Sequence, residues 1–145
     1  MKNNRQTAVR VMIVILALTG VALYMFLGSV SVSIGKDSIT VSGTLSKDVT
    51  LQYSDIKVFE LHSKLDTGVR SFGLCTRRTC TGQYSSPVYG PYHLFRYNNV
   101  EKLIMLRTAD GVLIFNCPTE DETVKCFEEI GKQIHNSVTS QKPEN

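Results

Sequence analysis

LIMLRTADGVLIFN, at residues 103–116, contains two short apolar runs on either side of a turn. Residues 102–108 and 112–116 have the length and the apolar character of buried strands. Between them, Ala109-Asp110-Gly111 supplies a tight turn, because Asp-Gly readily adopts the positive φ that hairpins need. The stretch therefore predicts two antiparallel strands and a fold that contains a sheet.

The residues after this hairpin predict a C-terminal helix. Thr119-Glu120-Asp121-Glu122 fits a capping box, in which the Thr119 hydroxyl accepts the Glu122 amide and the Glu122 carboxylate accepts the Thr119 amide. Four residues at helical spacing then form one apolar stripe: Thr123, Phe127, Ile130 and Ile134. The acidic cluster is thus explained by capping and by the helix dipole, and it predicts no metal site.

The residues before the hairpin predict further strands. Apolar and polar residues alternate over 30–34 and 39–42, and shorter strand patterns cover 49–53, 57–62 and 91–97. Residues 63–90 are rich in Gly, Ser and Thr, which favours loops and an irregular hairpin over a buried element. We therefore expect a mainly β domain of about seven strands over residues 30–138, a curled sheet or barrel capped by the helix.

The N-terminal segment is apolar enough to cross a membrane. VMIVILALTGVALYMFL, residues 11–27, is followed by Gly28-Ser29, and no charged residue occurs from 11 to 34. Its length approaches the hydrocarbon thickness at about 1.5 Å per residue, so we expect a transmembrane helix over 11–29. A cleaved secretory signal is the alternative; the bulky end of the apolar run favours a retained anchor.

The charges predict an orientation. Lys2, Arg5 and Arg10 precede the apolar segment and account for the net charge of +3. By the positive-inside rule, residues 1–10 form a basic cytoplasmic tail and the domain lies outside the cytoplasmic membrane. The domain itself is neutral and has no extended basic face, which argues against nucleic acid as a partner. Residues 139–145 are expected to be a disordered tail.

Several short motifs carry a family resemblance: ITVSG at 39–43, YSDI at 53–56, Gly90, Tyr92 and Tyr97, and the hairpin at 103–116. In this order and spacing they resemble the bacterial pleckstrin-homology-like domains, particularly the membrane-anchored group. The resemblance implies a strongly bent antiparallel barrel, closed by the C-terminal helix and used as a binding scaffold without shared catalytic residues. The four cysteines depart from the family pattern.

The cysteines suggest two disulfides if the domain faces an oxidising compartment. The preferred pairing joins Cys75 to Cys80 across a loop and Cys117 to Cys126 at the start of the helix. Free buried thiols remain open as an alternative. A zinc site with His62, His93 or His135 is another, although the Cys-x4-Cys and Cys-x8-Cys spacings do not match the usual paired ligands.

Arg77 and Arg78 form the most informative polar pair, because they occupy the tip of the loop that Cys75 and Cys80 would close. A rigid cationic loop is able to receive an anionic partner, whereas the simpler interpretation is a solvated loop tip. No nucleophile–base motif and no phosphate-binding glycine loop occurs. The sequence therefore predicts a membrane-anchored, non-catalytic module without a cofactor. It would bind a protein or envelope partner or, alternatively, a lipid headgroup or other anion through Arg77 and Arg78.

Overall fold

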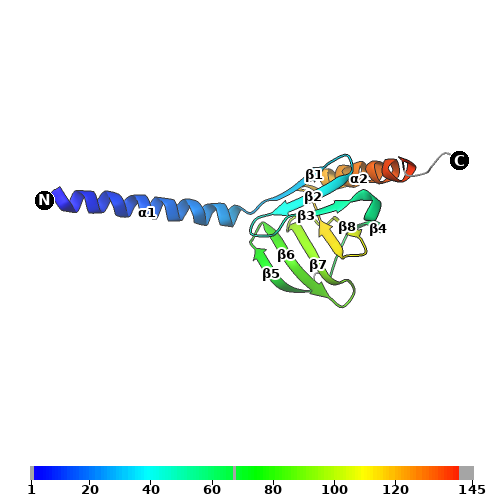
Figure 1. Ribbon diagram of the computed structural model, residues 1–145. Helices are drawn as coiled ribbons and strands as arrows, with labels where there is room; N and C mark the ends of the chain where they lie inside the picture. The colour runs from blue at the N-terminus through cyan, green and yellow to red at the C-terminus, as the bar shows by residue number, and fades with distance from the viewer. Residues whose placement is uncertain (1, 67, 141–145) are drawn as a thin grey trace.

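The computed structural model describes residues 2–66 and 68–140. In that part of the chain, nine strands and one short 3-10 helix lie between two α-helices (Figure 1). In chain order the elements are α1 (Lys2–Leu27), β1 (Val30–Ile34), β2 (Ser38–Gly43), β3 (Val49–Gln52), η1 (Tyr53–Asp55), β4 (Val58–His62), β5 (Val69–Cys75), β6 (Thr79–Ser86), β7 (Gly90–Tyr97), β8 (Leu103–Arg107), β9 (Val112–Phe115) and α2 (Glu120–Ser140). The predicted mainly β fold with a C-terminal helix is confirmed.

Helix α1 extends away from the β domain (Figure 1). Its apolar stretch Gln6–Tyr24 has 19 residues, none of them buried inside the protein. At about 1.5 Å per residue this stretch spans roughly 28 Å, close to the hydrocarbon thickness of a bilayer. The helix is therefore long and apolar enough to cross a membrane. It begins at Lys2, so most of the predicted basic tail is helical.

The strands form two sheets that are not closed into a barrel. One sheet has three strands in the order β1-β2-β3, and the other has six in the order β4-β8-β9-β7-β6-β5. Strand β9 lies between β7 and β8 and runs parallel to β7, with Leu94 opposite Ile114. The predicted bent antiparallel barrel is therefore wrong in two respects, namely closure and the direction of one strand pair. The pleckstrin-homology-like fold itself stays a prediction.

The parallel pair depends on a crossing of the chain between β7 and β8. The Asn116 side chain, which is fully buried, accepts a hydrogen bond from the Tyr97 amide at 2.6 Å. It donates to the carbonyls of Tyr97 at 3.2 Å and Val100 at 3.1 Å. These backbone groups would otherwise lack partners where the chain leaves the sheet, and a buried unpaired group is costly. Asn116 thus fixes the crossing that lets β9 enter the sheet.

The Gly-, Ser- and Thr-rich segment was expected to form loops and an irregular hairpin rather than a buried element. The irregular hairpin is present, with a register shift between Arg70 and Phe72, but the expectation that it is not buried is wrong. Residues 69–75 and 79–86 form two long paired strands, and β6 is buried over most of its length. Its buried positions include Thr79, Thr81 and Ser86, which are small enough to pack closely between neighbouring strands. The Thr81 hydroxyl donates to the Thr44 carbonyl at 2.7 Å, so its burial leaves no unpaired hydroxyl.

Helix α2 packs its apolar stripe against the sheets, as predicted. Thr123 and Ile130 are fully buried, and Phe127 stacks on Phe59 of β4 with 4.2 Å between ring centroids. At the helix start the Thr119 hydroxyl accepts the Glu122 amide as predicted, but it donates to the Glu122 carboxylate at 3.1 Å. The helix continues to Ser140, past the expected start of the disordered tail, and residues 141–145 lie outside the described residues.

The core has two parts, one on each face of the six-stranded sheet. The larger part lies between the two sheets and α2 and includes Ile39, Val41, Phe95, Ile104, Leu106, Phe115 and Ile130. The smaller part lies on the other face and includes Tyr84, Tyr92, Leu94, Met105 and Ile114. Because both faces are covered, strands β8 and β9 read as continuous apolar runs in the sequence.

Candidate functional site: the disulfide-closed loop beside the first helix

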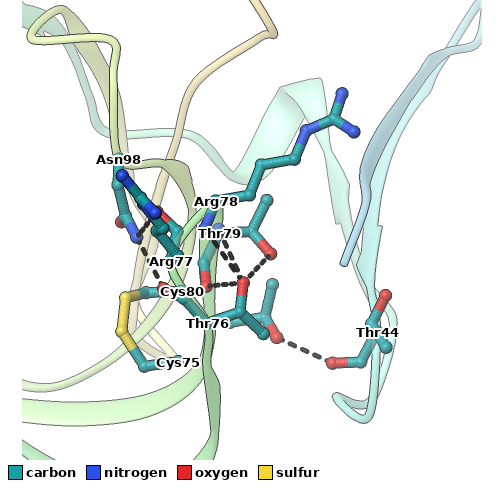
Figure 2. The surroundings of a disulfide bond; sticks show 9 residues. Thr44, Cys75, Thr76, Arg77, Arg78, Thr79, Cys80 and Asn98 are labelled. Carbon is teal, nitrogen blue, oxygen red and sulfur yellow. Dashed lines mark hydrogen bonds between the residues drawn. A yellow bond between two sulfur atoms is a disulfide. The ribbon is translucent and has the colours of Figure 1, made fainter. Parts of the chain in front are cut away.

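The loop between β5 and β6 is closed by a disulfide. Cys75 and Cys80 are paired in the strand register, and their sulfur atoms are bonded, which confirms the first predicted disulfide. Their Cα atoms are 4.0 Å apart. The bond fixes the two ends of a four-residue turn, Thr76-Arg77-Arg78-Thr79, whose two arginines are exposed (Figure 2).

Thr76 organises the inside of this turn. Its hydroxyl accepts hydrogen bonds from the amides of Arg78 at 3.2 Å and Thr79 at 3.0 Å. The same hydroxyl donates to the Thr79 carbonyl at 3.2 Å, and the Thr76 amide donates to that carbonyl at 2.7 Å. A side chain that bonds backbone groups two and three residues ahead is a common way to stabilise a tight turn. The backbone of the loop is therefore ordered independently of any ligand.

Asn98 holds the loop from the neighbouring strand end. Its side-chain amide donates to the carbonyls of Thr76 at 3.0 Å and Arg77 at 3.4 Å, and its backbone amide donates to the Arg78 carbonyl at 2.9 Å (Figure 2). Three carbonyls of the turn thus accept hydrogen bonds from one residue just after β7. Each of these carbonyls therefore has a hydrogen-bond partner within the protein, and the exposed groups of the loop are the two guanidinium groups.

Tyr97 links the loop to the first strand. The Arg78 guanidinium lies over the Tyr97 ring, 5.7 Å from its centroid, a geometry in which the ring attracts the cation. The Tyr97 hydroxyl donates to the Val30 carbonyl at 3.0 Å and accepts from the Val30 amide at 3.2 Å. Arg78, Tyr97 and Val30 therefore form a continuous chain of contacts from the loop tip to the residue that begins β1.

Gly28 places the loop next to the end of α1. It is buried and has φ +29°, a left-handed conformation that favours glycine. A Cβ at this position would clash with the Thr79 hydroxyl and would lie 3.5 Å from the Thr76 hydroxyl. The backbone that leaves α1 consequently packs directly against the turn that carries Arg77 and Arg78. No pattern in the sequence predicts this contact, which joins residues about fifty positions apart.

The two arginines carry unneutralised positive charge. Within residues 2–66 and 68–140, neither guanidinium forms a salt bridge with an acidic side chain. Figure 2 shows the Arg78 side chain extending away from the disulfide. Arginine presents planar donors that match carboxylate and phosphate oxygens, so the loop is chemically suited to an anionic group.

Cys117 and Cys126 are brought together but are not bonded. Both are free thiols in the structure, so the second predicted disulfide is not formed there. A hydrogen bond from Cys126 lowers the pKa of the Cys117 thiol, against the opposing effect of burial. The same hydrogen bond and burial raise the pKa of Cys126. Cys117 lies in the connection between β9 and α2, Cys126 lies on α2, and the Cys117 amide also donates to the Thr123 hydroxyl at 3.1 Å.

The histidines do not join the cysteines. His62 lies on β4 beside Glu60, with 2.9 Å between ring nitrogen and carboxylate, while His93 lies on β7 and His135 on α2. Burial and the positive charge of Lys47 lower the pKa of His93. No group of three metal-binding side chains occurs in the described part of the chain. The Cys75–Cys80 bond moreover removes two ligands from the alternative zinc set.

The predicted site residues therefore fall into two separate groups, the Arg77–Arg78 loop with its disulfide and the Cys117–Cys126 thiol pair. Residues that sequence reasoning missed are Thr76, Tyr97 and Asn98, which order the loop, and Gly28, which sets its position. Asn98 follows a strand and precedes a turn, a common place for a residue that binds backbone groups. Comparison of the chain with protein-family models, with characterised proteins and with solved structures found no match.

Proposed function

We propose that this chain is a single-pass membrane protein that displays a non-catalytic binding domain at the outer surface of the cytoplasmic membrane. The observation that carries the proposal is α1, whose 19-residue apolar stretch is entirely unburied and projects from the domain. Apolar side chains exposed over such a length are costly in water and favourable in a bilayer. The sequence resemblance to membrane-anchored pleckstrin-homology-like domains is consistent with a binding scaffold of this kind.

Two features support the outward orientation of the domain. Lys2, Arg5 and Arg10 all precede or begin the apolar stretch, as expected for a cytoplasmic N-terminus. The Cys75–Cys80 disulfide favours an oxidising compartment, because cytoplasmic reductants keep most thiols reduced. Charge and redox chemistry are independent arguments, and both favour a domain outside the cytoplasm.

Paired reporter fusions test this proposal. Alkaline phosphatase, which is active only outside the cytoplasm, and a fluorescent protein that folds inside it would each be fused after Asn145. We expect phosphatase activity and no fluorescence, and the opposite pattern would contradict the orientation. Affinity purification in mild detergent, with an unrelated single-pass protein as control, then tests the binding role. Recovery of the same proteins with both baits would count against a specific partner.

A second candidate function is the binding of anionic lipid headgroups by Arg77 and Arg78. The observation that favours it is the contact of Gly28 with the turn, which places both arginines beside the end of α1. If α1 spans the membrane, the loop then lies at the level of the phosphates. An arginine near an anionic surface contributes about 1 kcal/mol of attraction.

Native mass spectrometry of the full chain in neutral detergent, with added phosphatidylglycerol, tests the second candidate. We expect fewer bound lipids for the double variant R77A/R78A than for the unchanged chain. The control variant K125A/K132A removes two exposed cations from α2 and is expected to keep the lipids. Equal loss in both variants would mean that only net charge matters and would contradict a specific role for the loop.

A further inference from the structure

A cleft lies between the last turn of the apolar stretch of α1 and the turn that joins β2 to β3. Its volume is about 580 Å³, within the range of small-molecule sites. Val21 and Tyr24 line it from α1, and Leu45 lines it from the β2–β3 turn. Val21 and Tyr24 also belong to the stretch that is apolar enough to cross a membrane. The cleft therefore joins the apolar surface of α1 to the surface of the domain.

Leu45 is unusual in both conformation and exposure. It has φ 55°, and in the described part of the chain it is the one non-glycine residue with positive φ. Such positions are normally occupied by Gly, Asn or Asp, because a larger side chain meets the backbone. Its side chain is nevertheless 55% exposed and contributes to neither core cluster. Packing in either core cluster therefore does not explain an apolar side chain at this turn.

Polar residues also line the cleft. Ser31 on β1 and Ser42 on β2 are cross-strand partners, and both line the cleft. Within the described residues, neither hydroxyl has a hydrogen-bond partner in the protein. The Thr44 hydroxyl, which also lines the cleft, accepts the Ser29 amide at 3.0 Å and keeps its own proton to donate. Three hydroxyl donors thus line the same cleft as the apolar side chains of Val21, Tyr24 and Leu45.

We propose that this cleft holds the headgroup region of a phospholipid from the outer leaflet and that Leu45 inserts into the membrane surface beside it. The phosphate would accept hydrogen bonds from Ser31, Ser42 and Thr44, since hydrogen bonds to a charged acceptor are the stronger kind. Val21, Tyr24 and Leu45 would contact the upper acyl chains, and Tyr24 is an aromatic of the type enriched at this depth. The proposal rests on the proposed membrane anchor and adds a second contact between the domain and the bilayer.

A single-tryptophan reporter tests the insertion, because the chain contains no tryptophan of its own. The full chain carrying L45W would be reconstituted in nanodiscs of phosphatidylcholine and phosphatidylglycerol. We expect emission shifted to shorter wavelength and strong quenching by brominated phosphatidylcholine. The control V88W lies in the β6–β7 turn, at the end of β6 opposite the Arg77–Arg78 loop, and is 67% exposed. Its emission should be unshifted and unquenched.

The outcomes separate this proposal from the membrane anchor. A chain that enters nanodiscs but shows equal quenching for L45W and V88W would overturn the insertion of Leu45 and leave the anchor intact. A chain that fails to enter nanodiscs would overturn both.

The hydroxyl donors have their own test. In detergent, S31A/S42A is expected to retain less phosphatidylglycerol in native mass spectra than S33A, which removes an exposed hydroxyl from the same strand outside the cleft. Equal retention by S31A/S42A and S33A would overturn the headgroup site. Because no charge changes in either variant, this comparison is independent of Arg77 and Arg78.

Discussion

Substitution of Asn116 by alanine tests most directly how the fold supports the Arg77–Arg78 loop between β5 and β6. Asn116 is fully buried, and its side chain bonds the Tyr97 amide, the Tyr97 carbonyl and the Val100 carbonyl. Alanine leaves three buried backbone groups without these partners. Each unsatisfied group costs about 1–3 kcal/mol, and partial entry of water reduces the sum, so we expect a loss of about 3 kcal/mol.

Urea unfolding of the full chain in nonionic detergent, followed by circular dichroism, measures this loss. With an m value of about 1.5 kcal/mol/M, the midpoint of N116A should fall by about 2 M. N99A is the matched control, because Asn99 is an exposed asparagine in the β7–β8 connection, which Asn116 bonds through the Val100 carbonyl. Surface changes of this kind stay within about 0.5 kcal/mol. Equal midpoints for N116A and N99A would refute the role assigned to Asn116.

The same variant tests whether the crossing transmits order to the loop. Asn116 fixes Tyr97, and the next residue, Asn98, donates to the carbonyls of Thr76, Arg77 and Arg78. Hydrogen exchange at residues 76–80 should therefore accelerate in N116A and stay unchanged in N99A. Unaltered protection of these amides in N116A would show that the loop is ordered by its disulfide and Thr76 alone.

Three further predictions concern the helix junction, the thiols and alkaline pH. Gly28→Ala should destabilise the domain by about 1–3 kcal/mol. The effect should exceed that of Gly90→Ala, because Gly90 also has a positive φ but has open space around it. Equal destabilisation by the two variants in urea unfolding would contradict the steric role of Gly28. Iodoacetamide should modify Cys117 of the native chain before Cys126, since Cys117 has the lowered pKa and Cys126 the raised one, and mass spectrometry of the digested peptides shows the order. Burial raises the pKa of Tyr92 to about 12 from 10.0. The neutral Tyr92 side chain therefore contributes its full stabilisation below pH 10, and this stabilisation is lost as the pH rises to about 12. A Tyr92→Phe variant should lose less stability over this pH interval than the unchanged chain.

Local chemistry made part of this molecule predictable. The strands around residues 30–62 and 103–116 and the cap at Thr119 follow from short-range patterns, and the structure has all of them. The grouping of Cys75, Cys80, Arg77 and Arg78 on one loop was also predicted, because residues so closely spaced along the chain must lie close together in space. The burial of strand β6 was missed, because most of its buried residues are small or polar. Thr79, Thr81, Gly82 and Ser86 are buried beside Cys80 and Tyr84, and the burial of Thr81 depends on Thr44, which lies far away in sequence.

Long-range pairing explains the remaining errors. Insertion of β9 between β7 and β8 depends on the buried Asn116 and on its hydrogen bonds to the β7–β8 connection. An asparagine that follows a strand has no sequence pattern that predicts this role. The position of the arginine loop beside α1 depends on Gly28, one of ten glycines in the chain. The thiol pair of Cys117 and Cys126 was correctly placed together, while its redox state depends on the environment of the protein.

The shortness of the link between α1 and β1 limits where the domain can act. Helix α1 ends at Leu27 and β1 begins at Val30, so two residues separate them. Two extended residues reach about 7 Å, and the contacts of Gly28 and Val30 with the loop restrain even these. Under the proposed membrane anchor, a domain so restrained would move with its helix in the plane of the bilayer. Its effective concentration would then be high for binding partners located within about one domain diameter of that membrane, and negligible for partners farther from it.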